Sequence, residues 1–167
     1  MRRIAVIGTS CSGKTTLARS LANRLGSPHI EMDALNWGAN WTPVEHHQLR
    51  AEVTDRTQAK SWVTCGNYLM LRDVVWQRAD TIVWLNYSFP VIGSRALRRT
   101  FRRSLRREEL WAGNRESLQN AFFTRDQILL WELRTSRKSR RMHPQPLARP
   151  EHADRRAVAY TQVRAQH

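Results

Sequence analysis

Residues Gly8 to Thr15 have the types and spacing of a phosphate-binding loop. They read Gly-Thr-Ser-Cys-Ser-Gly-Lys-Thr and fit the P-loop pattern G-x-x-x-x-G-K-[ST]. The glycines let backbone N–H groups turn toward phosphate oxygens, while Lys14 can reach the outer phosphates and the Thr15 hydroxyl can ligate Mg²⁺. We therefore expect the chain to bind a nucleoside triphosphate and Mg²⁺ through eight residues, which are Gly8, Ser10, Cys11, Ser12, Gly13, Lys14, Thr15 and Thr16.

The residues around this loop predict the strand–loop–helix setting that the motif requires. An apolar strand precedes it at 3–7, and a helix follows at 16–25 with Leu17, Leu21 and Leu25 on one face. Further strands are expected at 29–33, 61–65, 81–85 and, more weakly, 157–160; further helices are expected at 43–60, 72–78, 90–110 and 115–136. Strands that alternate with helices predict an α/β fold, in which a parallel sheet has helices on both faces and binds ligands at the carboxyl ends of its strands.

Two carboxylates close the second predicted strand at that ligand end. Glu31 and Asp33 are two residues apart, so in a strand their side chains would point the same way. We assign Glu31, with Thr15, to the metal and Asp33 to the acceptor of a phosphoryl group; a structural pair of acids beside a basic helix is the alternative. Four more residues are acceptor-binding candidates, namely Trp37, Gly66, Asn67 and Arg72. Trp37 could equally be a core anchor, and Arg72 could pair with a nearby aspartate.

Arginine dominates the second half of the chain. Residues 1–90 carry ten basic and seven acidic side chains, whereas residues 91–167 carry eighteen and seven. Seven arginines lie between residues 95 and 107, and Arg95, Arg99, Arg102 and Arg106 share one helical stripe. Mutual repulsion in such a stripe is relieved by a polyanion. We expect an arginine-rich lid over a transferring phosphoryl group, with Lys14, Asp33, Arg95, Arg99 and Arg115 as catalytic residues. Binding of a nucleic-acid backbone is the alternative.

Size and composition predict a single domain over residues 1–167, with the lid at about 95–116 and a basic tail from about residue 137. No apolar run is long enough to cross a bilayer, and the first residues do not form a signal-peptide pattern. Cys11 and Cys65 do not suggest a disulfide framework. We expect a cytoplasmic protein without a membrane partner.

Several motifs in order resemble those of the adenylate kinase-like P-loop proteins called DNA topology modulation (flagellar regulator-related) proteins. They comprise the P-loop and the residues at 33–37, 65–68, 72–73, 79–85 and 109–116, together with the arginine helix. The chain is more distantly similar to shikimate and nucleoside monophosphate kinases. The resemblance implies ATP binding and a five-stranded kinase sheet in the strand order 2-3-1-4-5, and it leaves the acceptor open.

One residue departs from the pattern of such kinases, whose third strand commonly ends in Asp-Gly. Here Cys65 precedes Gly66, and a neutral thiol cannot replace a carboxylate beside Mg²⁺. The leading expectation is a kinase that moves the γ-phosphoryl group of ATP to a nucleotide, nucleoside or other small hydroxyl compound. The alternative is a nucleic-acid-associated NTP-binding protein acting in DNA topology modulation. A P-loop protein that binds ATP without turnover is a third possibility.

Overall fold

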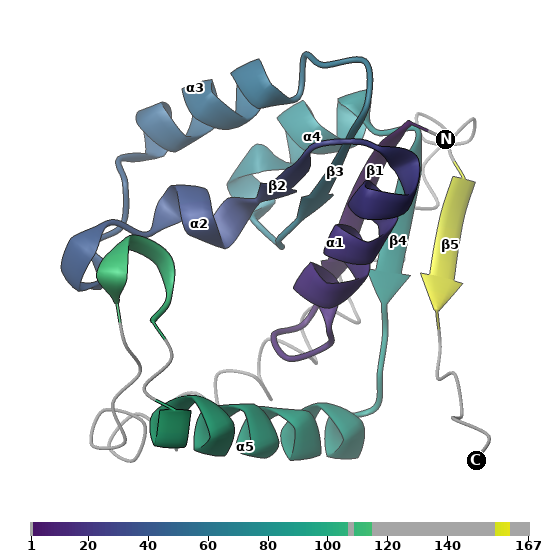
Figure 1. The fold of residues 1–167 in the computed structure, drawn as a ribbon. Coiled ribbons are helices and arrows are strands. Elements are labelled where there is room, and N and C mark those ends of the chain that lie inside the picture. The colour runs from purple at the N-terminus through teal and green to yellow at the C-terminus, as the bar shows by residue number, and fades with distance from the viewer. Residues whose placement is uncertain (1, 107–108, 115–155, 161–167) are drawn as a thin grey trace.

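A parallel β-sheet forms the centre of the computed structural model, which describes residues 2–106, 109–114 and 156–160 (Figure 1). The strands β1 (Arg3–Gly8), β2 (His29–Glu31), β3 (Trp62–Cys65) and β4 (Thr81–Leu85) lie in the order β2-β3-β1-β4. This order is the one predicted for these four strands. The segment Arg156–Tyr160 forms β5 and pairs in parallel with β4, Thr81 opposite Arg156 and Leu85 opposite Tyr160.

Helices cover both faces of the sheet and also its ligand end. The helix α1 (Lys14–Leu25) lies on one face, and α3 (His46–Arg56) and α4 (Arg72–Arg78) lie on the other. The helix α5 (Phe89–Arg106) follows β4 and crosses below the carboxyl ends of the strands (Figure 1). Shorter elements are α2 (Met32–Asn36) and the 3₁₀ turns η1 (Ala39–Trp41), η2 (Leu69–Leu71) and η3 (Trp111–Gly113). The helix predicted at 115–136 lies outside the described residues.

Alternation along the strands divides the core into two layers. On β1, Ala5 and Ile7 pack with residues of α3 and α4, whereas Ile4 and Val6 pack with Ala18 and Ala22 of α1. The alanines are fully buried, which lets α1 lie close to the sheet. The predicted leucine stripe therefore lies beside the helix face that contacts the sheet and not at its centre. Leu17 and Leu21 are only partly buried, and Leu25 is 44% exposed.

Two predicted elements end earlier than expected. The second strand has only three residues, because Met32 already begins α2, and Asp33 therefore lies in the first helical turn rather than in a strand. The helix predicted from Pro43 to Lys60 spans only His46 to Arg56. Pro43 instead forms an isolated bridge with Trp37, which closes the loop after α2. Between residues 2 and 106, 109 and 114, and 156 and 160, no helix is long and apolar enough to span a membrane.

Gly66 holds the end of β3 against α2. Its φ is +147°, and a Cβ at this position would lie 2.8 Å from the Cβ of Met32, which is buried. An L-residue would have to adopt an unfavourable backbone conformation and also displace the Met32 side chain. The close approach therefore requires glycine.

Gly66→Ala should lower the free energy of unfolding by about 2–4 kcal/mol, because backbone strain and overpacking add at one buried site. Chemical denaturation of purified protein measures the change. Gly38→Ala is the matched control, since Gly38 has a negative φ and its added Cβ would lie 3.4 Å from the nearest atom, the Thr42 carbonyl oxygen. Equal losses in the two variants would contradict the role of the Gly66–Met32 contact.

Candidate functional site

The loop between β1 and α1 has the conformation of an anion-binding turn. Gly8 and Gly13 have φ values of +150° and +89°, and Cys11 also lies in the left-handed region at +58°. A Cβ on Gly8 would lie 2.8 Å from the carbonyl oxygen of Leu85, whereas a Cβ on Gly13 would meet nothing within 4 Å. The open side at Gly13 adjoins the N-terminus of α1, whose first N–H groups have no carbonyl partner within the helix.

Lys14 is the first residue of α1, and its side chain turns back over the loop. Its Nζ donates a hydrogen bond to the Thr9 carbonyl oxygen at 2.7 Å. Burial lowers the pKa of Lys14, and the nearby Asp33 carboxylate acts in the opposite direction. An anion placed in the loop would likewise raise this pKa, because it would favour the charged amine.

Thr15 and Glu31 bring two oxygen atoms together beside the loop. The Thr15 hydroxyl donates to Oε1 of Glu31 at 3.1 Å, so the end of β2 contacts the start of α1. Hydroxyl and carboxylate oxygens suit Mg²⁺, which takes few protein ligands and completes its shell with water and phosphate oxygens. This pair of donors fits the metal that the P-loop motif implies. Over the described ranges, His, Cys, Asp and Glu side chains form no cluster of three that could hold a metal ion.

Strand alternation directs Cys65 toward α1 rather than toward α4. Its Sγ lies 3.7 Å from the Thr15 hydroxyl oxygen and 3.3 Å from Nε2 of His29. Burial raises the pKa of the Cys65 thiol to about 11, and the Glu31 and Asp33 carboxylates add to the effect. The thiol therefore stays neutral near pH 7, next to the residues that suit a metal.

Asp33 reaches the same region from α2. Its Oδ1 accepts a hydrogen bond of 2.8 Å from the Tyr68 hydroxyl, and burial raises the pKa of Tyr68 above its usual range. The prediction that Asp33 and Glu31 lie on one strand was wrong. Both residues nevertheless line the same cavity, because the chain turns into α2 immediately after β2.

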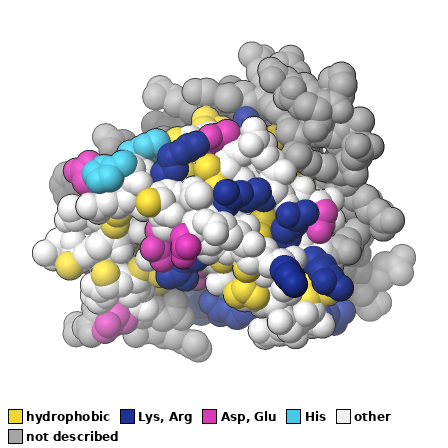
Figure 2. Space-filling model, turned by 90° about the horizontal axis from the view of Figure 1, so that it is seen from above, with side chains coloured by type: hydrophobic (Ala, Val, Ile, Leu, Met, Phe, Trp, Pro, Cys, Tyr) yellow, Lys and Arg dark blue, Asp and Glu magenta, His cyan; other side chains and the backbone are white. Residues whose placement is uncertain are grey.

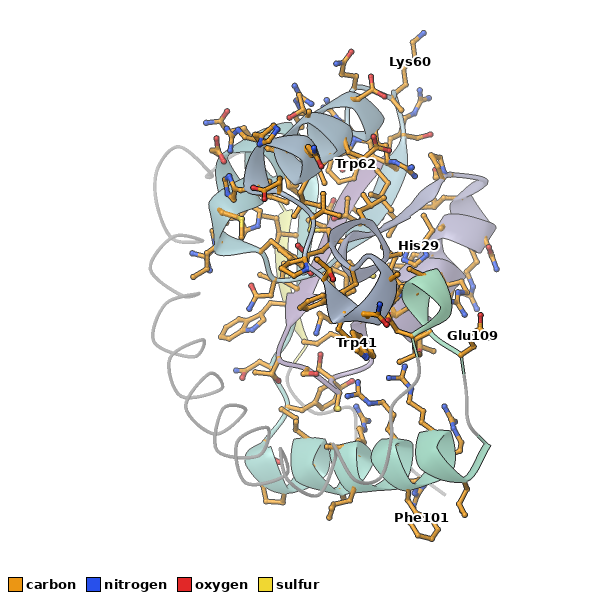
Figure 3. The ribbon with its side chains drawn as sticks, turned by 90° about the vertical axis from the view of Figure 1, so that its left-hand side faces the viewer. His29, Trp41, Lys60, Trp62, Phe101 and Glu109 are labelled. Atoms are coloured by element: carbon orange, nitrogen blue, oxygen red, sulfur yellow. The ribbon has the colours of Figure 1, made fainter. Side chains whose placement is uncertain are left out.

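This cavity has a volume of about 670 Å³ and lies between the loop, the ends of β2 and α2, and the arginine face of α5. Figure 3 shows side chains of α5 reaching toward the sheet, while Phe101 points away from it. Lys14 and five arginines face three acids here; the arginines are Arg19, Arg95, Arg99, Arg102 and Arg103, and the acids are Glu31, Asp33 and Glu109. The side chains that line the cavity therefore carry a net positive charge.

Two of the predicted lid residues lie directly against the loop. Arg95 stacks on the Tyr87 ring, 4.4 Å from its centroid, and its Nη1 donates to the Ser12 carbonyl oxygen at 3.4 Å. The Nε of Arg99 is buried and has no hydrogen-bond partner among the described residues, and the charge of Arg99 helps to lower the pKa of Lys14. A buried donor beside the Lys14 amine is the arrangement that an oxyanion would satisfy. Arg115, the third predicted lid residue, lies outside the described part of the chain.

The other predicted acceptor residues do not line this cavity. Gly66, Asn67 and Arg72 surround a separate space of about 10 Å³ beside Tyr68, which has room for one water. Arg72 packs over the Trp76 ring, 4.6 Å from its centroid. Trp37 packs edge-on against Trp41. The structure therefore brings together the loop, Glu31, Asp33, Arg95 and Arg99, and leaves these four residues outside the group.

Sequence reasoning missed several residues of the cavity wall. Leu110 and Trp111 line it next to Glu109, and Arg19 enters from α1, one turn after Thr15. The helical spacing of Arg19 from Thr15 was a usable signal. Nothing local in the sequence predicts that the segment after α5 returns to the cavity.

No known protein family and no curated protein matches the sequence. Solved structures do match. A gluconokinase from Sinorhizobium meliloti 1021 is 21% identical with a TM-score of 0.54, and the match covers 96% of this chain and 82% of that one. A shikimate kinase from Acinetobacter baumannii, in complex with shikimate, is 20% identical with a TM-score of 0.54 over 100% and 86% of the two chains. A shikimate kinase from Bacteroides thetaiotaomicron is 15% identical with a TM-score of 0.53 over 96% and 86%. The chain therefore has a P-loop kinase fold.

The two cysteines should differ sharply in reactivity. At pH 8 a thiol with a pKa of about 11 is only about 0.1% thiolate, and Cys65 is also buried, whereas Cys11 lines the cavity. Iodoacetamide should therefore modify Cys11 first, as measured by peptide mass spectrometry over time, and saturating MgATP should slow that reaction. Equal rates at the two cysteines would contradict the placement of Cys65.

Proposed function

We propose that this chain is a kinase that transfers the γ-phosphoryl group of ATP to a hydroxyl group of a small acceptor. The observation that supports it best is the single cavity of about 670 Å³ shared by Lys14, Glu31, Asp33 and the arginine face of α5. Phosphoryl transfer needs little covalent chemistry from the protein, and it depends on positioning and on stabilisation of negative charge. Those are the properties that this cavity provides.

The triphosphate would lie along the loop. Backbone N–H groups from Gly8 to Thr16 and the positive end of α1 would contact phosphate oxygens, with Ser10, Cys11, Ser12 and Gly13 forming the cradle. Lys14 would exchange its bond to the Thr9 carbonyl oxygen for the outer phosphates. Mg²⁺, held by Thr15 and by Glu31 directly or through water, would neutralise charge on the phosphate oxygens.

Asp33 would hold the acceptor. The bond from the Tyr68 hydroxyl occupies Oδ1 and fixes the orientation of the carboxylate, so that Oδ2 can accept a hydrogen bond from the acceptor hydroxyl. Arg95 and Arg99 approach the loop from α5 and would stabilise charge that develops on the transferring group. Arg115 is proposed for the same role from the sequence alone, and Trp37, Gly66, Asn67 and Arg72 stay predictions as acceptor contacts.

The charge of the cavity favours an anionic acceptor. Six basic and three acidic side chains line it, whereas MgATP carries a charge of about −2. One further negative charge on the acceptor would balance the lining. Gluconate and shikimate, after which the matched kinases are named, are the first acceptors to test.

Membership in the DNA topology modulation group stays a proposal that rests on the order of the sequence motifs. We favour a small acceptor over nucleic acid, because the arginines Arg95, Arg99, Arg102 and Arg103 line the same cavity of about 670 Å³ as Lys14 and Asp33. On the face opposite α5, basic side chains lie among acidic and uncharged ones (Figure 2). Among the described residues, that face shows no continuous basic stripe of the kind that follows a nucleic-acid backbone.

Lys14→Ala should lower acceptor-dependent ATP consumption by about 10²–10³-fold, the usual loss when one positioned donor to the reacting phosphate is removed. Coupled measurement of ADP release over a panel of hydroxy acids, nucleosides and nucleotides tests this. Lys60→Ala is the matched control, because Lys60 lies at the far end of the molecule from α5 (Figure 3). A chain that shows no acceptor-dependent turnover but binds DNA in a salt-sensitive way would favour the alternative function.

Asp33→Asn should lower kcat by about 10²–10⁴-fold, because the amide cannot accept the acceptor's proton. The affinity for MgATP, measured by calorimetry, should stay close to that of the original chain. Asp55→Asn on the exposed side of α3 provides the control. If Asp33→Asn retained full kcat, the assignment of this carboxylate to the acceptor would be wrong.

A further inference from the structure

Two strained turns meet at the wall of the cavity that lies farthest from β4. In the loop after α2, Asn40 and Trp41 both have left-handed backbones, with φ of +55° and +56°. In the segment after α5, Ala112 and Gly113 have φ of +53° and +77°. Left-handed conformations are unfavourable for residues other than glycine, above all for a large side chain such as tryptophan, and they persist where surrounding contacts hold them.

Asn114 supplies those contacts and is itself buried. Its Oδ1 accepts a hydrogen bond from the Trp41 N–H at 2.9 Å, and its Nδ2 donates to the carbonyl oxygens of Gly38 and Trp111, each at 2.8 Å. Its own carbonyl oxygen accepts from the Leu110 N–H at 2.7 Å. The Asn114 side chain therefore satisfies backbone groups in both turns, although Trp41 and Asn114 are 73 residues apart in the sequence.

Aromatic packing joins the same two turns. Trp41 lies edge-on to Trp111, with 6.3 Å between ring centroids, and edge-on to Trp37 at 5.9 Å. Trp111 and Leu110 line the cavity beside Glu109, opposite the loop. Figure 1 shows the short green turn after α5 beside the segment that follows α2, and Figure 3 places Glu109 between that turn and α5.

We propose that Asn114 is a positioning residue that latches the segment after α5 to the loop after α2 and so closes the acceptor end of the cavity. The inference rests on the proposed kinase function, because the wall it fixes stands beside α2, which carries Asp33. With the latch closed, Trp111 excludes water from the acceptor end, and transfer to an acceptor is favoured over hydrolysis. With the latch broken, both turns can relax to ordinary backbone conformations and admit water.

Hydrogen exchange tests the latch directly. In Asn114→Ala, amides of the peptide spanning residues 38–42 should exchange about tenfold faster or more, because local opening no longer requires breaking the Asn114 bonds. Peptides from β1 and β3 should be unchanged, which shows that the variant is folded. Asn114→Asp keeps an acceptor for the Trp41 N–H and should restore part of the protection. Asn23→Ala, an exposed asparagine on α1, is the matched control.

Hydrolysis of MgATP without an acceptor tests the role in excluding water. Asn114→Ala should raise this rate about threefold or more while MgATP affinity changes by less than about twofold, a pattern that a general loss of stability would not produce. Unchanged exchange at residues 38–42 would overturn the latch, whether or not the chain is a kinase. In an active kinase, faster exchange without faster hydrolysis would overturn it too. A wild-type chain without turnover would refute the proposed function. The exchange rate at residues 38–42 would then decide by itself whether Asn114 holds the two turns together.

Discussion

The close contact between the turn after β1 and the end of β4 is the constraint on which the rest of the structure depends. Gly8 lies so near the Leu85 carbonyl oxygen that no side chain fits, and this lets the chain turn tightly into α1. The tight turn places Lys14 and Thr15 at the start of a helix whose N–H groups face the ligand end of the sheet. Because β4 ends at the same level, α5 follows it across that end (Figure 1), and four of its arginines line the cavity beside the turn.

Placing so many cations over one helix N-terminus is unfavourable without an anion, and the structure shows how it is tolerated. The Arg95 guanidinium stacks on the Tyr87 ring and donates a hydrogen bond to a backbone carbonyl oxygen. The Lys14 amine donates to the Thr9 carbonyl oxygen. These partners are neutral, so they hold the side chains without cancelling their charge. A phosphate chain would supply the missing negative charge at little cost in reorganisation, which is why the cavity is suited to anionic ligands.

The parts of the fold that local patterns encode could be predicted from the sequence, and the parts that depend on distant partners could not. The bounds of α4 and β4 match the prediction, because Arg72 to Arg78 and Thr81 to Leu85 are separated by a clear break at residues 79–80. The early end of β2 was missed, since polar and apolar residues alternate over 29–33, a pattern typical of a half-buried strand. The latch through Asn114 was also missed, because its partners Gly38 and Trp41 lie more than 70 residues away in the sequence and no spacing rule connects them. The loop cavity could be predicted because a motif specifies it; the composition of its far wall depends on tertiary packing.

Cys65 gains a physical explanation from the groups around it. A carboxylate at this position would lie beside the Thr15 hydroxyl and close to Glu31 and Asp33, whose charges already raise the pKa of the thiol. A third negative charge there would repel both acids. Glu31 reaches Thr15 from β2, the strand paired with β3, and it supplies a carboxylate from the neighbouring position. In the proposed kinase, Glu31 would therefore supply from the neighbouring strand the carboxylate that Cys65 cannot, so a neutral residue at the end of β3 would be compatible with phosphoryl transfer.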